Sequence, residues 1–132
     1  MFNLDLKDKV ILITGGSDGL GYASAELLSS EGAKVIICGR RGDYLSEKAK
    51  TISENTNNNV LAIQADVSKA EDCKRLVEET ISKFKKIDIL VNNAGASAAA
   101  LFEDVSDKNW EDDINLKLMS TIRMCRLVIP YM

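Results

Sequence analysis

The sequence of 132 residues contains no histidine. This absence excludes Ser-His-Asp catalytic triads and the commonest zinc sites, because both depend on imidazole. No apolar stretch approaches the ~20 residues that a helix needs to cross a bilayer, and the apolar run 10–13 is too short for a signal peptide. The three cysteines, Cys38, Cys73 and Cys125, lack metal-ligand spacing, so neither a metal site nor a disulfide framework is expected. We therefore expect a soluble, cytoplasmic protein.

Strong charge of one sign is also missing, since the net charge is only −3. The densest basic patch, Lys83, Lys85 and Lys86, falls at a predicted helix end, where cations complement the helix dipole. A nucleic-acid partner, which needs clustered positive charge, is therefore not expected. Hydrophobic residues at 45% and charged residues at 28% are ordinary globular values. The length fits a single domain over residues 1–132.

Short apolar runs alternate with longer segments of helical period. The runs cover residues 10–14, 34–38, 60–64 and 87–92. Most are β-branched and nearly continuous, as expected for parallel strands that are covered on both faces. Strands that alternate with helices predict an α/β fold with a Rossmann-type parallel sheet flanked by helices.

Local signals predict where the helices begin and end. Ser68 and Glu71 have the spacing of a capping box at the start of the third helix. The turn-rich stretch 55–59 is expected to be a surface connection. A continuous last helix is predicted from about Lys108 to Ile129, opened near Ser106 and stopped at Pro130. Its first turns place Trp110, Ile114 and Leu118 on one face. Its last turns are apolar nearly all round, so this helix is expected to be deeply buried or shared with a partner.

A glycine-rich segment, Thr-Gly-Gly-Ser-Asp-Gly-Leu-Gly at residues 14–21, joins the first strand to the first helix. Gly15, Gly19 and Gly21 allow a sharp turn and a close approach to a pyrophosphate, while the helix N-terminus offers free N–H groups. A Walker A loop is excluded, because no Gly-Lys-Ser/Thr follows. A glycine turn without a ligand and a methyltransferase loop remain alternatives at this point.

Four motifs in order give a more specific indication. They are the glycine segment 14–21, the pair Asp66 and Val67, the sequence Asn-Asn-Ala-Gly at 92–95, and Asp-Ile-Asn-Leu at 113–116. In this order and spacing the chain resembles the short-chain dehydrogenase/reductase family over essentially its whole length. The resemblance implies a strand order of 3-2-1-4 within this chain. A methyltransferase is disfavoured, because nothing in that class accounts for residues 92–95.

The resemblance also implies a cofactor site and one supporting catalytic residue. The implied cofactor residues are Gly15, Ser17, Asp18, Gly19, Leu20, Gly21, Arg40, Asp66, Val67, Asn93, Ala94 and Gly95. In the family, the counterpart of Asn92 ties the fourth strand to its neighbours. The counterpart of Asn115 belongs to the catalytic tetrad and holds a water in the proton relay.

The residues after the second strand favour one nicotinamide cofactor. NAD-binding Rossmann units carry a carboxylate near this point, which bonds the ribose 2′-hydroxyl. Here Gly39 is followed by Arg40 and Arg41. A guanidinium can hold a 2′-phosphate through charge-assisted hydrogen bonds, so NADP(H) is favoured over NAD(H), with Arg40 as the phosphate ligand. Arg41 is equally well explained as a solvated surface charge. Asp18 is the one contrary sign.

The family reaction is hydride transfer between the nicotinamide and a carbonyl or alcohol substrate. By resemblance it needs a serine and a Tyr-x-x-x-Lys pair that follow the last helix, and the chain is predicted to stop before them. Tyr44 and Lys48 have the Tyr-x-x-x-Lys spacing, but they start the second helix, far from the expected nicotinamide end. We interpret Tyr44 as a helix residue that packs near Leu45. The isolated chain is therefore expected to be inactive alone.

A chain that ends before the later strands leaves residues 87–92 as an open sheet edge, apolar on both faces. Such an edge invites pairing with another chain, so an oligomer through this edge or the last helix is expected. Three functions follow: part of an NADP(H)-dependent oxidoreductase, a dinucleotide-binding module without catalysis, or a fragment that pairs with a partner.

Overall fold

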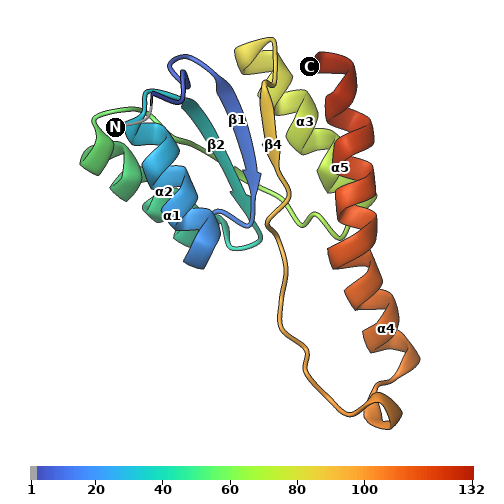
Figure 1. The fold of residues 1–132 in the computed structure, drawn as a ribbon. Coiled ribbons are helices and arrows are strands. Elements are labelled where there is room, and N and C mark those ends of the chain that lie inside the picture. Colours follow the sequence, from blue (N-terminus) through green and yellow to red (C-terminus); the bar gives the residue numbers. More distant parts are fainter. Residues whose placement is uncertain (1–2) are drawn as a thin grey trace.

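A computed structural model describes residues 3–132 and shows one sheet with helices on both faces (Figure 1). The strands are β1 (Val10–Thr14), β2 (Lys34–Gly39), β3 (Leu61–Gln64) and β4 (Ile89–Val91). The helices are α1 (Gly19–Ser30), α2 (Gly42–Thr56), α3 (Ala70–Phe84), α4 (Asp107–Ile114) and α5 (Ser120–Val128). Two short 3-10 helices, η1 (Phe102–Asp104) and η3 (Ile129–Tyr131), and a π-helical segment, η2 (Asn115–Met119), complete the described elements.

The sheet is parallel throughout and has the order β3-β2-β1-β4. Ile11 of β1 lies opposite Val35 of β2 on one side and Ile89 of β4 on the other. The predicted Rossmann-type sheet and its strand order are thereby confirmed. From β1 the chain adds β2 and β3 on one side of the sheet and then β4 on the other side. The direction of strand addition therefore reverses next to β1.

Each central strand is buried on both faces because its apolar residues alternate between two layers. Leu12 and Ile36 belong to the core beneath α3 and α5, whereas Ile13 and Ile37 belong to the core beneath α1 and α2. In Figure 1 these two helix pairs lie on opposite sides of the sheet. The nearly unbroken β-branched runs of the sequence are explained by this double coverage.

The last helical stretch differs from the predicted continuous α-helix. The prediction placed one helix from Lys108 to Ile129, but the α-helical hydrogen bonds give way to a π-helical segment at residues 115–119. The predicted start is confirmed, since the Ser106 side chain caps α4 by accepting a hydrogen bond from the N–H of Asn109 at 3.2 Å. Only one face of the stretch is buried: Met124 and Val128 reach the core.

Two other local predictions were wrong. Ser68 does not cap α3, because its hydroxyl donates to the Asp66 carboxylate at 2.6 Å, and the helix begins at Ala70 without a side-chain cap. The connection expected over residues 55–59 starts later, because α2 continues to Thr56 and ends at Asn57 in a left-handed conformation. At Ser68, the contact with the Asp66 carboxylate outweighs the local capping signal.

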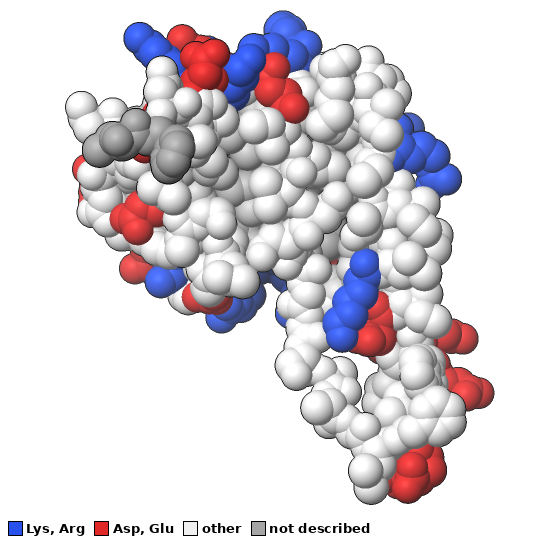
Figure 2. All heavy atoms as spheres, in the orientation of Figure 1, with Lys and Arg blue, Asp and Glu red and all other residues white. Residues whose placement is uncertain are grey.

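The strand β4 forms one edge of the sheet. It is only three residues long, half-buried, and pairs with β1 alone. The middle of the molecule in the view of Figure 2 carries few charged side chains. Within residues 3–132, no helix combines the length and the apolar character needed to cross a membrane.

Candidate functional site

A cleft of about 260 Å³ opens at the carboxyl ends of the strands. Its walls come from the segments that follow β1, β2, β3 and β4, together with one residue of the π-helical segment. It is lined by Gly15, Ser17, Asp18, Cys38, Gly39, Arg40, Arg41, Ala65, Asp66, Val67, Asn93, Ala94, Gly95 and Leu116. In open α/β sheets, ligands bind at this edge where the strand order reverses.

The glycine segment forms the floor between β1 and α1. Gly15 has a φ of +69°, and a Cβ there would come within 2.9 Å of the Ala94 Cα. A Cβ on Gly21 would collide with the Gly15 carbonyl group, so the first turn of α1 packs directly on the loop. Larger residues at these two positions would close the space between the loop and the segment after β4. The sharp turn that the sequence predicted is therefore present at Gly15, whereas Gly21 is required by close packing within the loop.

The N-terminus of α1 keeps its N–H groups free. Asp18 occupies the N-cap position, but its carboxylate does not cap the helix. Within residues 3–132, the N–H groups of Gly19, Leu20 and Gly21 take part in no hydrogen bond. Unpaired N–H groups at a helix N-terminus favour an anion such as a phosphate.

Two neighbouring arginines behave differently. The Arg41 guanidinium pairs with the Asp18 carboxylate at 3.0 Å and lies 4.0 Å from the centre of the Tyr44 ring. The Tyr44 hydroxyl donates to the same carboxylate at 2.5 Å. Arg40 lines the cleft, is exposed, and its guanidinium has no hydrogen bond or ion pair with any described residue. Of the two, Arg40 is the cation available to a ligand.

Asp66 sits in the tight turn after β3. One of its carboxylate oxygens accepts hydrogen bonds from both the N–H and the hydroxyl of Ser68, at 3.0 and 2.6 Å. Burial alone would raise the pKa of Asp66, but these bonds and the charges of Lys69 and Arg40 outweigh it and lower the pKa. The side chain is therefore held as a carboxylate at the wall of the cleft, beside Val67.

The segment after β4 is fastened to β1 by Asn93. Its side-chain amide donates to the carbonyl groups of Thr14 and Gly15, at 3.1 and 2.9 Å, and the N–H groups of Asn93 and Ala94 both donate to the Thr14 hydroxyl at 3.0 Å. Asn92 was predicted to tie the fourth strand to its neighbours. Its exposed side-chain amide lies 3.5 Å from the Cys125 sulfur of α5, and its role stays a prediction.

Asn115 begins the π-helical segment between α4 and α5. Such π-helical turns occur frequently at functional sites. The next residue, Leu116, lines the cleft, whereas Asn115 is half-buried and does not. Its catalytic role stays a prediction.

The structure brings most of the predicted cofactor residues together in the cleft. Gly19, Leu20 and Gly21 are not part of the lining and form the first turn of α1 instead, with Leu20 largely exposed. The prediction missed five lining residues: Cys38, Gly39, Arg41, Ala65 and Leu116. Apart from Leu116, these lie within two residues of predicted positions, so the strand ends carried a usable signal. Burial raises the pKa of the Cys38 thiol to about 12, so Cys38 contributes shape rather than reactivity.

Tyr44 and Lys48 belong to a separate polar cluster on α1 and α2. The Lys48 ammonium lies 5.2 Å from the ring centres of both Tyr22 and Tyr44. The Tyr44 side chain points to Asp18 and not into the core beside Leu45, which corrects the interpretation of Tyr44 as a packing residue. Tyr44 lies on the arginine side of the cleft, where its ring also contacts Arg41.

The sheet order, the glycine turn and the cleft at the strand ends define a nucleotide-binding Rossmann-type fold. The family model described as short chain dehydrogenase matches residues 9–132. The chain belongs to this family of oxidoreductases.

Individual relatives agree with this assignment. The chain is 34% identical over its full length to the 11-beta-hydroxysteroid dehydrogenase A of Sesamum indicum, and covers 38% of that protein. It superposes on L-sorbose reductase from Gluconobacter frateurii complexed with NADPH and L-sorbose, with a TM-score of 0.96 and 34% identity, over 99% of this chain and 50% of that one. It also matches the NADH-dependent reductase A1-R′ complexed with NAD, with a TM-score of 0.89 and 32% identity, over 99% and 54%. The chain thus spans about half or less of the length of these relatives.

Proposed function

We propose that this chain forms the NADP(H) site of a short-chain dehydrogenase/reductase that transfers hydride to or from a small carbonyl or alcohol substrate. The observation that carries the proposal is the cleft at the strand ends, which unites the glycine turn, the free Arg40 guanidinium and the Asp66 turn. The three free cysteines, Cys38, Cys73 and Cys125, fit a reducing compartment, and we place the protein in the cytoplasm.

The residues of the cleft fit a dinucleotide. The space beside Gly15 and the free N–H groups of the first turn of α1 suit the pyrophosphate. Asp66 and Val67 would hold the adenine, and Asn93, Ala94 and Gly95 would line the site toward the nicotinamide. When bound, the nicotinamide supplies or accepts the hydride.

Arg40 decides the proposed choice of cofactor. A free guanidinium at the end of β2 would bind a 2′-phosphate, whereas no carboxylate stands there to bond a 2′-hydroxyl. Asp18 lies on the same side of the cleft, but its charge is compensated by Arg41. Two similar structures are complexed with different cofactors, NADPH and NAD, so the choice depends on the residues of this chain.

Proton transfer requires groups beyond the cleft described above. In the proposed whole protein, a serine and a Tyr-x-x-x-Lys pair that follow residue 132 would serve the reacting carbon, and Asn115 would support them. Tyr44 and Lys48 are unsuited to this task because Tyr44 is engaged by Asp18 on the arginine side.

A second candidate function is pairing with another chain, with or without bound dinucleotide. It is favoured by the outer edge of β4, which no described strand pairs, and by exposed apolar residues along α4, η2 and α5, such as Ile114, Leu118 and Ile122. Light scattering at tens of micromolar separates the possibilities: a stable monomer would count against pairing.

The cofactor proposal is tested by calorimetric titration of the chain with NADPH and NADH. Arg40→Ala is expected to weaken NADPH binding by about tenfold to a hundredfold, since charge-assisted hydrogen bonds contribute about 1.5–3 kcal/mol. NADH binding should change by less than about twofold, because NADH has no 2′-phosphate.

Arg126→Ala is the matched control, because Arg126 is also exposed but lies on α5, away from the cleft. It should bind both cofactors like the unchanged chain. Equal losses of NADPH and NADH affinity in Arg40→Ala would contradict the assignment of the 2′-phosphate to Arg40. An unchanged chain that binds neither cofactor would overturn the proposed function.

A further inference from the structure

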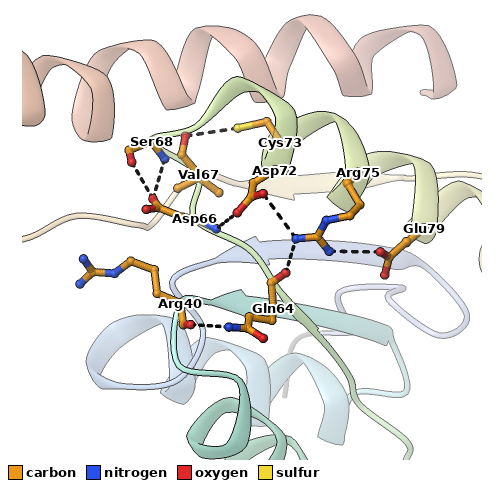
Figure 3. A network of polar contacts seen from close by, with 9 residues as sticks. All are labelled: Arg40, Gln64, Asp66, Val67, Ser68, Asp72, Cys73, Arg75 and Glu79. Atoms are coloured by element: carbon orange, nitrogen blue, oxygen red, sulfur yellow. Dashed lines mark hydrogen bonds and ion pairs between the residues drawn. The ribbon is translucent and has the colours of Figure 1, made fainter.

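Behind the cleft, three polar residues form a connected chain of contacts between two of its walls. These residues are Gln64, Arg75 and Asp72, and none of them lines the cleft. Figure 3 shows them between the turn that carries Arg40 and the turn that carries Asp66. We refer to the three as the bracket.

The first contact of the bracket fixes the turn after β2. The Gln64 side-chain amide donates to the Arg40 carbonyl group at 2.9 Å. A Cβ on Gly42 would come within 2.7 Å of the Gln64 side-chain oxygen. The Gln64 side chain therefore fits here because residue 42 is a glycine. The backbone from which the Arg40 side chain extends is therefore held from outside the cleft.

The second contact passes through Arg75. One terminal nitrogen of its guanidinium donates to the Gln64 backbone carbonyl at 2.7 Å and lies 3.6 Å from the Asp72 carboxylate. The other donates to Glu79 at 3.1 Å. The planar guanidinium thus joins the end of β3 to the first and third turns of α3, a geometry that lysine could not reproduce.

The third contact fixes the Asp66 turn. The Asp72 carboxylate accepts a hydrogen bond from the Asp66 N–H at 2.7 Å. The Asp66 side chain is turned the other way, toward Ser68 and the cleft. In the view of Figure 3, the Asp66 carboxylate and the Arg40 guanidinium lie together at the left, while Arg75 and Glu79 lie at the right.

A purely stabilising role is the simpler explanation for a carboxylate at this place. Glu71 and Asp72 both lie in the first turn of α3, where negative charge interacts favourably with the helix dipole. Glu71, however, is exposed and makes no side-chain hydrogen bond or ion pair with any described residue. The two residues therefore share the dipole effect and differ in the contact with Asp66.

We propose that Gln64, Arg75 and Asp72 are positioning residues for the adenosine half of the cofactor, which they serve by holding the Arg40 turn and the Asp66 turn in fixed relation. This inference rests on the proposed dinucleotide site. It assigns part of the cofactor affinity to residues that do not touch the cofactor.

The test compares Asp72→Ala with Glu71→Ala in titrations of the whole chain with NADPH and with NADH. Asp72→Ala is expected to weaken both by about tenfold, equivalent to about 1.4 kcal/mol, because both contain adenine. Glu71→Ala should stay within about twofold of the unchanged chain. Asp72→Asn keeps an acceptor oxygen and should restore most of the affinity. Equal effects of the two alanine variants would overturn the proposal, as would unchanged binding in a folded Asp72→Ala.

Gln64→Met provides a second arm that does not depend on the folding of Asp72→Ala. Gln64 is exposed, and methionine keeps its length but cannot donate to the Arg40 carbonyl group. NADPH affinity should fall about fivefold more than NADH affinity, because the mispositioned Arg40 serves only the 2′-phosphate. An unchanged ratio would overturn the role of Gln64. Failure of the unchanged chain to bind either cofactor would instead disprove the dinucleotide site itself.

Discussion

Residues 9–87 and residues 88–119 are built in different ways. In the first region every strand contributes buried side chains, and two apolar layers enclose β1 and β2. In the second region no residue is buried, and the chain runs as an extended segment to η1 and α4 (Figure 1). After Ile87, buried residues return only from Ser120 onward, among them Met124 and Val128.

The contrast shows which part of the proposed site is fixed by this chain's own packing. The glycine turn, the arginine turn and the Asp66 turn all follow strands within the first region, so the adenosine and pyrophosphate walls have a rigid base. The second region is fastened at its beginning by the pairing of β4 with β1 and by Asn93, and at its end by α5. Beyond β4, the proposed nicotinamide wall therefore depends on the few polar contacts of Asn93 and Ala94 with β1.

The largest expected difference between the two regions is in stability. Leu12→Ala should lower the free energy of unfolding by about 2–5 kcal/mol, because Leu12 is fully buried and its removal leaves a cavity. Leu118→Ala should change it by no more than about 0.5 kcal/mol, because Leu118 is 55% exposed. Urea unfolding followed by circular dichroism measures both. Similar losses for the two variants would show that Leu118 is covered in solution, as in an oligomer.

A smaller effect is expected where the two regions join. The Asp88 carboxylate accepts a hydrogen bond from the Val10 N–H at 2.8 Å and pairs with Lys86 at 3.0 Å. The bond from Val10 and the charge of Lys86 lower the pKa of Asp88. Asp88→Ala should therefore cost about 1.5–3 kcal/mol of unfolding free energy at pH 7.

The same contact gives a pH dependence. Because the folded-state pKa of Asp88 is lowered, its stabilisation is present above about pH 4 and is lost as the pH falls through the folded-state value. The difference between the unchanged chain and Asp88→Ala should shrink over this range in urea unfolding. Asp112→Ala, which removes an exposed pair with Lys108, serves as the control and should cost less than about 1 kcal/mol. A difference that does not shrink at all as the pH falls below about 4 would contradict the assignment.

The smallest effect is expected at the arginine turn. Asp18→Asn should raise NADPH affinity about twofold to fivefold and leave NADH affinity unchanged, because it removes a negative charge near the proposed phosphate position and releases Arg41. Asp43→Asn removes an exposed charge from the first turn of α2 and is the control. Reduced NADPH affinity in Asp18→Asn would instead show that binding needs Arg41 to be held in place by Asp18.

Much of the fold could be predicted because its determinants are local. Continuous β-branched runs identify strands covered on both faces, and a glycine at position 15 meets a steric need that any ligand-binding turn of this type shares. The residues that follow these strands were assigned to the cofactor site through the family resemblance. They meet in the cleft because the carboxyl ends of parallel strands lie at one edge of the sheet.

The remaining features depend on contacts between distant segments. The pairing of Asp18 with Arg41 and Tyr44, and the hydrogen bond from the Asp66 N–H to Asp72, have no signature in local sequence. Ser68 had the spacing of a helix cap, but a carboxylate two residues away offered a better partner. The π-helical turn at Asn115 arises within a segment whose periodicity predicts an ordinary helix.

The position of β4 beside β1 also bears on how the protein is made. The hydrogen bond between Val10 and Asp88 joins residues 78 positions apart, so one side of β1 has no partner until β4 has been synthesised. At roughly 5–20 residues per second, this interval lasts about 4 to 16 seconds for each new chain. During that time the nascent β1 presents an apolar strand edge to its surroundings, and chaperone binding near the ribosome would protect it from aggregation.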